Sequence, residues 1–392
     1  MEAPPESREP TLLLLKGDVH RETKKVGSLQ FQPIDRDGEA RAGMLHVAGQ
    51  SIETPVFMPV GTNATVKAIT VEELKSIGYR LILGNTYHLN LRPGDGIIKK
   101  LGGLHRFMNW SRAILTDSGG FQIFSLGRLN KVTEEGVLFQ NHLDGKKIAL
   151  TPERSIEIQE NLGSDIMMVL DECLGLPVER ETAQRSVERT TRWAKRCFEA
   201  RRSAAGLFAV VQGADYDDLR IESAQCLAET DFDGFAIGGL SVGEERETMY
   251  RIVRLTAPRL PRDKPRYLMG VGEPVDLLES IAAGIDMFDC VMATRNARNG
   301  CLFTSDGKIS IKRAQYKEDG APIEEDCTCE VCQNYSRAYL RHLYQANEIL
   351  SSRLNSYHNL HFFKRLMEEA RTAILKKRYD RFKRDFITRY RN

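Results

Sequence analysis

Short apolar runs alternate with amphipathic stretches along most of the chain, beginning near Phe31. Each run is followed by a polar or glycine turn and then by a pattern of helical period. Amphipathic stretches between the runs include Glu181–Arg201, Asp217–Glu229 and Glu247–Thr256. The eight apolar runs are Pro55–Val60, Arg80–Gly84, Ile114–Asp117, Asp165–Asp171, Leu207–Gln212, Gly234–Gly238, Arg266–Gly270 and Ile285–Asp289. Repeated strand–helix units with nearly continuous apolar strands predict an α/β fold. Eight such units favour a closed TIM-type (β/α)8 barrel, although periodicity alone leaves an open doubly wound sheet possible.

Polar residues and bare glycine follow most of these runs. They are Asp117, Ser118, Asp171, Gln212, Gly238, Gly239, Gly270 and Asp289. In such barrels the chemistry lies at the carboxyl ends of the strands, so these groups are predicted to converge on one mouth. Any single aspartate could instead cap a helix, but three together favour a site. Paired carboxylates suit work at a sugar anomeric carbon, and an acid with an amide could read the edge of a planar heterocycle.

A cysteine cluster near the C-terminus indicates a metal site. Cys327, Cys329 and Cys332 lie within six residues of one another, and 25 residues separate Cys332 from His358. Three thiolates and one imidazole form a closed tetrahedral set for Zn²⁺, with no position left for water, which predicts a structural role. Spacing favours His358 only slightly, and His342 and His361 remain alternatives.

Composition excludes a mostly disordered or fibrous protein. The chain has 392 residues, of which 41% are hydrophobic and 28% charged, and no apolar stretch approaches the ~20 residues of a membrane span. We therefore expect a soluble, cytoplasmic protein. Residues 1–28 are predicted to be a mobile extension. Residues 29–312 with C-terminal helices form the expected barrel, 313–365 a zinc-binding subdomain, and 366–392 a basic C-terminal helix.

Basic residues are concentrated at two places. The net charge is +2, but eleven basic and four acidic residues follow from Lys364 to the end. This local excess could attract phosphates or could simply be a solvated helix face. Arg295 and Arg298 lie in a polar segment, Thr294–Arg298, that we expect to be a loop beside the mouth. They could grip phosphates or bases, or merely solvate that loop.

From about Phe31 to the C-terminal helix, the sequence resembles the bacterial type of tRNA-guanine transglycosylase. The matching segments are TPVFMPVGT (Thr54–Thr62), LGNTYHL (Leu83–Leu89), LTDSGGFQ (Leu115–Gln122), GSDIMMVLDEC (Gly163–Cys173), VQG (Val211–Gly213), FAIGGLSVGE (Phe235–Glu244), RYLMGVG (Arg266–Gly272), GIDMFDCVMATRNARNG (Gly284–Gly300) and SYHN (Ser356–Asn359). Because so many motifs occur in the order typical of the family, the resemblance is highly specific. The SYHN motif makes His358 the favoured fourth ligand.

The resemblance implies a barrel with a small C-terminal zinc-binding helical insertion, acting as a homodimer. It implies exchange of the wobble guanine of U-G-U anticodon tRNAs, those for Asp, Asn, His and Tyr, with 7-aminomethyl-7-deazaguanine. Asp289 would be the nucleophile and Asp117 the general acid/base. The base pocket would comprise Ser118, Gly119, Gly120, Phe121, Asp171, Gln212, Gly239 and Leu240. The anticodon stem-loop would contact a loop of Gly270, Val271, Gly272, Glu273, Pro274, Val275 and Asp276, and the segment Thr294, Arg295, Asn296, Ala297 and Arg298.

The incoming base rests on a narrower argument. Val242 and Cys173 stand where queuine-using members of the family tend to have glycine and no cysteine. The Leu240 carbonyl, with its peptide oriented by Glu244, could meet the ammonium of the smaller base. Ser241 and the segment Leu174–Gly175–Leu176 depart from the bacterial pattern, as does Ala293, which replaces a proline. Queuine therefore remains an alternative. A non-catalytic RNA-binding paralogue is opposed by the presence of both Asp117 and Asp289, and a zinc hydrolase by the closed ligand set.

Overall fold

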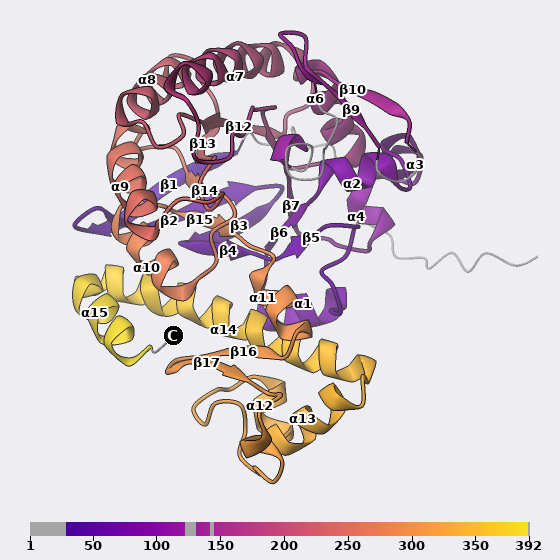
Figure 1. Cartoon of the computed structure of the whole chain (residues 1–392), viewed down its shortest axis with the longest axis vertical. Coiled ribbons are helices and arrows are strands. Elements are labelled where there is room, and N and C mark those ends of the chain that lie inside the picture. The colour runs from indigo at the N-terminus through magenta and orange to yellow at the C-terminus, as the bar shows by residue number, and fades with distance from the viewer. Residues whose placement is uncertain (1–28, 122–130, 142–144, 391–392) are drawn as a thin grey trace, which may run out of the picture.

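Parallel strands form a nearly closed barrel surrounded by helices in the computed structural model of the chain, which describes residues 29–121, 131–141 and 145–390 (Figure 1). The predicted extension 1–28 lies outside these residues. The strand order is β4-β15-β14-β13-β12-β11-β7-β6-β5. The bounds are β4 Val56–Met58, β5 Val60–Gly61, β6 Leu81–Gly84, β7 Ala113–Thr116, β11 Ile166–Met168, β12 Gly206–Val211, β13 Gly234–Ile237, β14 Arg266–Leu268 and β15 Met287–Asp289. The eight predicted runs each contribute to this sheet, so the barrel is confirmed.

The first predicted run closes the barrel because it contacts both neighbouring strands. Pro59 divides it into β4, which pairs with β15, and β5, which pairs with β6. Proline has no N–H to donate, but the Pro59 carbonyl still accepts a hydrogen bond from the Leu83 amide at 2.9 Å. The interruption therefore leaves the ladder to β6 intact.

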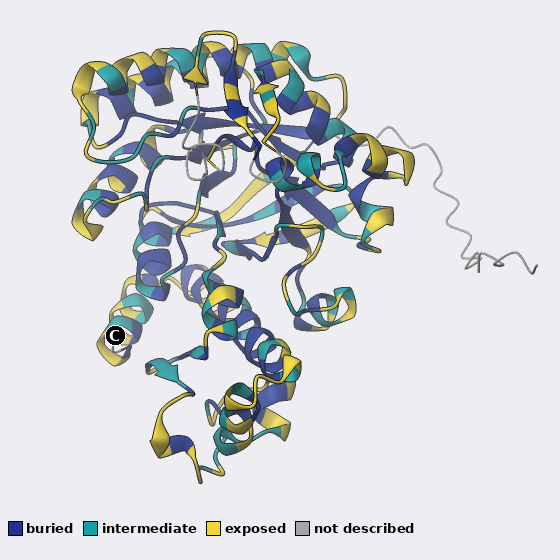
Figure 2. Cartoon of the chain, turned by 45° about the vertical axis from the view of Figure 1, so that its right-hand side comes forward, coloured by how far each residue is buried: buried dark blue, intermediate teal, exposed yellow. Residues whose placement is uncertain are grey.

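Helices cover the outside of the barrel and bury their apolar faces against it (Figure 2). The three predicted amphipathic stretches are α7 Arg180–Ala200, α8 Asp217–Ala228 and α9 Arg246–Thr256, each within one residue of its expected ends. The other helices of this part are α1 Val71–Ile77, α2 Thr86–Leu91, α3 Asp95–Lys100, α4 Gly103–Phe107, α6 Pro152–Leu162, η1 Ala257–Arg259, α10 Pro274–Ala282 and α11 Met292–Arg298. None of the helices in the described ranges is long and apolar enough to cross a membrane.

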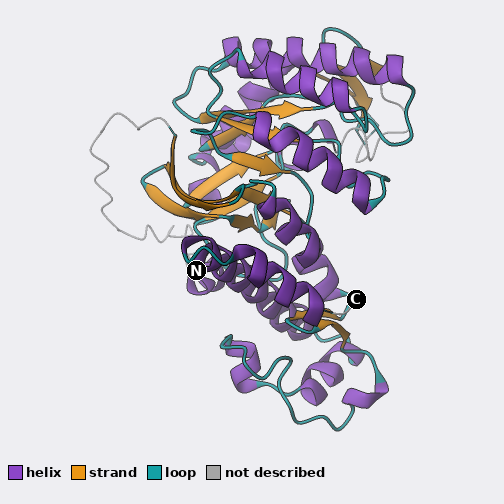
Figure 3. Cartoon of the chain, turned by 90° about the vertical axis from the view of Figure 1, so that its left-hand side faces the viewer, coloured by secondary structure: helices purple, strands orange, loops and turns teal. Residues whose placement is uncertain are grey.

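Three antiparallel sheets that the sequence pattern did not reveal accompany the barrel (Figure 3). They are β1 Gln30–Asp37 with β2 Ala40–Val47 and β3 Gln50–Thr54; β8 Lys131–Val132 with β9 Val137–Gln140 and β10 Lys147–Leu150; and β16 Cys301–Thr304 with β17 Gly307–Ser310. Arg41 of β2 forms a buried ion pair with Asp286, which precedes β15. The first sheet thus lies at the amino ends of the barrel strands, opposite the predicted mouth.

One long helix joins the barrel to a small subdomain. α14 runs unbroken over Ile349–Leu375 and packs against both parts. The expected boundary at 365/366 therefore falls inside a helix, and the C-terminal segment comprises the end of α14 and a separate α15, Tyr379–Arg389. The subdomain also contains η2 Ala314–Tyr316, α12 Glu330–Asn334 and α13 Arg337–Gln345.

The basic C-terminal segment is largely neutralised within the chain. Within residues 364–390, seven basic side chains form ion pairs: Lys364, Arg365, Arg371, Lys377, Arg381, Lys383 and Arg389. Arg371 also donates to the carbonyls of Gly43 and Thr54. These contacts favour a role in holding α14 and α15 against the barrel over a role in attracting phosphates.

Candidate active site and metal centre

Asp289 lies at the carboxyl end of β15, with one of its oxygens held by two donors. The Tyr267 hydroxyl donates to Oδ1 at 2.5 Å, and the Gly270 amide donates to the same oxygen at 2.9 Å. Burial raises the pKa of Asp289, and these two hydrogen bonds oppose that rise. The side chain stays partly exposed, so a reactant at the mouth can reach the carboxylate.

Asp117 follows β7 and is anchored by the turn that precedes α2. Its Oδ2 accepts from the Asn85 side-chain amide at 2.7 Å, and its Oδ1 accepts from the Thr86 amide at 2.8 Å. Since Asn85 is the N-cap of α2, Asp117 also contributes to the start of that helix. Asp117 therefore helps to cap a helix, and this contact is compatible with its predicted role in the site.

Tyr267 donates a hydrogen bond to Asp289 and lies within electrostatic range of Asp117. This tyrosine of β14 is fully buried, and its pKa is raised well above its usual value by burial first and then by the negative charges of Asp289 and Asp117. A buried phenol surrounded in this way keeps its proton and serves as a hydrogen-bond donor. Asp117 and Asp289 thus lie near one phenol at the same end of the barrel.

Asp171 and Gln212 form a buried polar pair beside these groups. The Gln212 amide donates to Asp171 Oδ2 at 2.7 Å, and the Ser118 hydroxyl lies 3.4 Å from Oδ1. Burial raises the pKa of Asp171 to about 6, although the hydrogen bonds from Gln212 and Ser118 lower it. Asp171 is thus a carboxylic acid in a buried environment that disfavours its charged form, and such perturbed groups are concentrated at functional sites.

Glycine is required around this pair because the backbone approaches it closely. A Cβ on Gly239 would lie 2.3 Å from the Gln212 oxygen, and one on Gly120 would lie 2.8 Å from the Asp171 carbonyl. Gly239 also has a φ of +62°, which side chains rarely adopt. Two residues that follow these positions in the sequence, Cys173 and Leu240, are buried, whereas Phe121 is exposed.

Two charged residues hold the turn after β13. Arg220 of α8 is fully buried and donates to the carbonyls of Val211, Gly238 and Gly239. Glu244 accepts from the amides of Ser241 and Val242, the latter at 2.9 Å. Ser241 has a φ of +60°, a strained conformation for a residue with a side chain, and the Glu244 carboxylate stabilises it.

The predicted RNA-contacting segments differ from the expected loops. Thr294–Arg298 belongs to α11, where Thr294 and Ala297 are buried, Arg295 is exposed, and Asn296 and Arg298 are partly exposed. The expected loop Gly270–Asp276 ends at Glu273, because α10 begins at Pro274. The side chains of Val271, Pro274 and Asp276 are buried, with Asp276 accepting from the Tyr250 hydroxyl at 2.5 Å.

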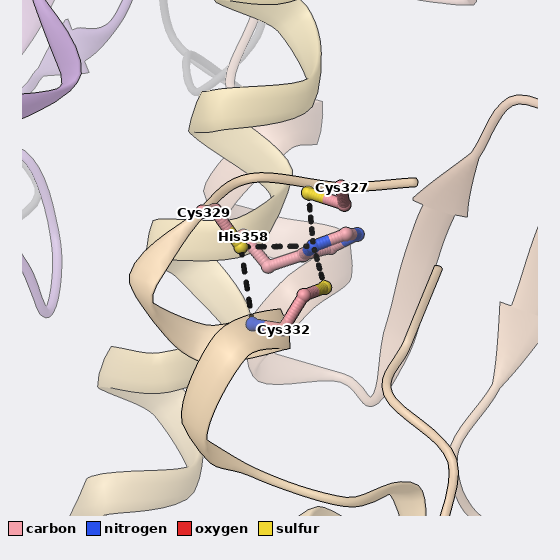
Figure 4. Close-up of side chains that lie close together, drawn as sticks. All are labelled: Cys327, Cys329, Cys332 and His358. Carbon is pink, nitrogen blue, oxygen red and sulfur yellow. Dashed lines mark hydrogen bonds between the residues drawn. The ribbon is translucent and has the colours of Figure 1, made fainter. Parts of the chain in front are cut away.

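The three clustered cysteines and His358 form a buried group of four (Figure 4). His358 Nδ1 lies 3.9, 3.6 and 3.4 Å from the sulfur atoms of Cys327, Cys329 and Cys332. Tetrahedral Zn²⁺ with ordinary bond lengths separates sulfur and nitrogen ligands by about 3.6 Å, so the spacing fits one ion. The other ring nitrogen, Nε2, lies 2.8 Å from the Phe303 carbonyl and can donate its proton to it. The lone pair of Nδ1 is then free to bind a metal.

The rival histidines fit less well. His361 Nδ1 lies 3.7 Å from the Cys327 sulfur but belongs to no four-ligand group in the described part of the chain, and His342 is exposed. The residue after His358, Asn359, connects this part of α14 to α11 through hydrogen bonds. The Asn359 side chain accepts from the Phe303 amide and donates to the carbonyls of Ala293 and Cys301.

Known proteins with a similar sequence identify the family of this chain. The family model described as queuine tRNA-ribosyltransferase matches residues 35–392. A queuine tRNA-ribosyltransferase of Fusobacterium nucleatum is 59% identical over 92% of this chain and 98% of its own. Those of Caldanaerobacter subterraneus and Bacillus subtilis are each 56% identical, over 93% and 90% of this chain and 98% and 93% of their own. The chain belongs to the queuine tRNA-ribosyltransferase family.

Membership in the queuine tRNA-ribosyltransferase family makes the chain a tRNA-guanine transglycosylase. It favours an enzyme over both a non-catalytic RNA-binding paralogue and a zinc hydrolase. Residues that sequence reasoning missed are Tyr267, Arg220 and Asn85. Arg220 left a signal, because it lies at helical spacing from the apolar Ala224 and Leu227 on the buried face of α8.

Proposed function

We propose that the chain replaces the wobble guanine of tRNAs for Asp, Asn, His and Tyr, which share a U-G-U anticodon context, with 7-aminomethyl-7-deazaguanine. The observation that carries the proposal is the Asp289 carboxylate, held through Oδ1 at the barrel mouth, with the Asp117 carboxylate fixed by Asn85 and Thr86 at the same end of the barrel. A carboxylate ester preserves the energy of the glycosidic bond while the bases exchange. This account implies a covalent aspartyl–RNA intermediate.

The exchange comprises two balanced steps. In the first, an Asp289 oxygen forms a bond to ribose C1′ while the bond from C1′ to the guanine nitrogen breaks. The electron pair leaves with the base, and Asp117 supplies the proton that neutralises it. In the second, the incoming base gives its ring proton to Asp117 and attacks C1′, and Asp289 departs as a carboxylate. The target nucleotide must first turn out of the anticodon stack to reach the mouth.

The pair Asp171–Gln212 would recognise the base. A guanine edge presents a ring N–H and an amino group, which match the two oxygens of one carboxylate. Ser118, Gly119, Gly120, Phe121, Gly239 and Leu240 would line the same pocket. The close backbone approach at Gly120 and Gly239 supports a flat, tightly bounded slot.

Base binding should weaken in mild acid. The pKa of Asp171 is about 6 in the folded chain, which is higher than in the unfolded chain. The ionised side chain therefore lowers the free energy of unfolding above pH 6, and protonation below that pH removes this loss. Because protonated Asp171 cannot accept both donors, guanine affinity should fall by about tenfold for each pH unit below 6. Titration calorimetry with guanine at pH 7.5 and 5.0 measures this. Asp171→Asn serves as the control and should bind weakly without that pH dependence, whereas equal wild-type affinity at both pH values would contradict the assignment.

The turn after β13 supports the smaller incoming base. Since Glu244 accepts from the Ser241 amide, the carbonyl of the Leu240–Ser241 peptide points the opposite way, as planarity of a trans peptide requires. That carbonyl can meet the ammonium of an aminomethyl group. Val242 in this turn and the buried Cys173 would restrict the space that a larger substituent needs.

Competition between the two bases tests the proposed reaction. With tRNA carrying labelled guanine at the wobble position, 7-aminomethyl-7-deazaguanine should release the label at least about tenfold more efficiently than queuine, because a buried substituent without room is excluded. Val242→Gly should narrow the difference. Equal release by both bases would refute the steric argument, and no release by either would refute the exchange itself.

The exposed edge of α11 would contact the anticodon loop. Arg295 is exposed and Arg298 is partly exposed, but the Nη1 atom of Arg298 is buried and has no hydrogen-bond partner in the described part of the chain. Lys312 and Arg313 are exposed and form no ion pair among the residues described, although Lys312 lies over the ring of Tyr344. Phosphate and base contacts to tRNA follow from such unpaired cations. We also propose a homodimer and a cytoplasmic location, where tRNA substrate is found.

The metal at the cysteine–histidine centre would be Zn²⁺ in a structural role. Cys327, Cys329, Cys332 and His358 would hold it, and their complete set of four leaves no position for a substrate. When bound, the ion would supply cross-linking of the subdomain to α14 and no step of the base exchange.

A further inference from the structure

Both hydrogen bonds to the Asp289 carboxylate converge on one oxygen. The Tyr267 hydroxyl and the Gly270 amide reach Oδ1 at 2.5 and 2.9 Å. Within the described ranges, no donor reaches Oδ2. The two oxygens of this carboxylate are therefore inequivalent before any substrate arrives.

The two donors come from rigid parts of the barrel. Tyr267 is fully buried in β14, and its main chain pairs with Met287 of β15, two residues before Asp289. Gly270 has a φ of +74°, and this left-handed conformation belongs to the turn that aims its amide at Asp289. A Cβ on Gly270 would meet nothing within 4 Å, so backbone conformation rather than space requires glycine here.

We propose that Tyr267 and Gly270 are positioning residues that reserve Oδ2 as the attacking atom and stabilise Asp289 as a carboxylate. The inference rests on the proposed function, in which Asp289 forms an ester with ribose C1′. In that ester Oδ1 is the carbonyl oxygen and keeps both donors. When the incoming base attacks C1′, the C1′–Oδ2 bond breaks and its electron pair returns to the carboxylate, whose charge the two donors stabilise.

The surrounding charges make this pair of donors important. Asp117 beyond β7 adds negative charge near Tyr267, as does Asp289 itself. Burial raises the pKa of the neighbouring Cys290 thiol to about 12, so it is neutral at working pH, and Arg295 of α11 acts on that thiol. Burial alone would favour protonated Asp289, and among the described groups Tyr267 and Gly270 are those that lower its pKa. Removing one donor should therefore raise that pKa.

Tyr267→Phe provides the test, because it removes only the donor. Single-turnover adduct formation with an anticodon stem-loop RNA is measured against pH in the full chain. The low-pH midpoint should rise by about one unit, and 7-aminomethyl-7-deazaguanine should resolve the trapped ester about tenfold more slowly. RNA affinity should be unchanged. Gly270→Ala keeps the amide but disfavours the left-handed conformation that aims it at Asp289. It should therefore weaken the second hydrogen bond and shift the midpoint in the same direction.

Tyr250→Phe is the matched control, since it removes another buried hydroxyl that donates to an aspartate at 2.5 Å, here Asp276. It should lose a comparable amount of thermal stability and leave the pH midpoint and ester lifetime unchanged. An unchanged midpoint and lifetime in Tyr267→Phe, with normal adduct in the wild type, would overturn the inference alone. Absence of any wild-type adduct on Asp289 would instead overturn the proposed function.

Discussion

Replacing Asp289 with asparagine is expected to abolish the covalent protein–RNA adduct and to slow base exchange by about 10⁴-fold or more. Asparagine keeps the shape of the side chain and an oxygen for the Tyr267 and Gly270 donors, but it lacks the negative charge needed to attack C1′. Denaturing electrophoresis of protein mixed with anticodon stem-loop RNA measures the adduct directly.

RNA binding separates this prediction from a general loss of structure. Affinity for the stem-loop should remain within about twofold, because Asp289 of β15 is not among the expected RNA contacts on α11 and in the loop after β14. Asp263→Asn, at an exposed acid without an ion pair among the described residues, is the control and should give a full yield of adduct. Wild-type adduct yield in Asp289→Asn would rule out Asp289 as the nucleophile.

Replacing His358 with alanine is expected to remove the bound metal and to lower stability by on the order of 5 kcal/mol or more, because metal binding and local folding are coupled. His358 is fully buried, and its ring joins the sulfur cluster to the Phe303 carbonyl. Elemental analysis of metal content and thermal unfolding measure the two losses. RNA affinity should also fall, since the next residue, Asn359, holds the Ala293 carbonyl of α11.

Two neighbouring histidines provide the controls for that experiment. His361→Ala removes a ring nitrogen 3.7 Å from the Cys327 sulfur, and His342→Ala alters an exposed side chain of α13. Both variants should keep one metal ion per chain. Full metal content in His358→Ala together with metal loss in either control would show that the ligand set is wrong.

The barrel was predictable because its signal is local. Each parallel strand is buried on both faces, so the eight runs are almost continuously apolar, and helices such as α7 show a clear helical period. The segment Thr294–Arg298 gave no such signal, since it is mostly polar. Its helix is instead stabilised from α14, where Asn359 and Asn355 donate to the Ala293 and Ala297 carbonyls.

The candidate site was predictable in its residue types but not in its partners. Strand topology alone places Asp117, Asp171, Gln212 and Asp289 at one end of the barrel. The hydrogen bond from Tyr267 to Asp289 depends on side chains of two adjacent strands, and no pattern along the chain indicates it. Likewise, cysteine spacing identifies a metal site, whereas the choice of His358 over His361 depends on which ring nitrogen faces all three sulfur atoms.

Locating the RNA attachment within the chain tests the central claim most directly. The adduct formed with anticodon stem-loop RNA would be trapped by denaturation and digested with protease and nuclease, and the peptides would be sequenced by mass spectrometry. The account predicts that the residual nucleotide mass is carried by the peptide containing Met287, Phe288 and Asp289, with the mass on the aspartate. A nucleotide attached to Asp117, Asp171 or any other residue would contradict it.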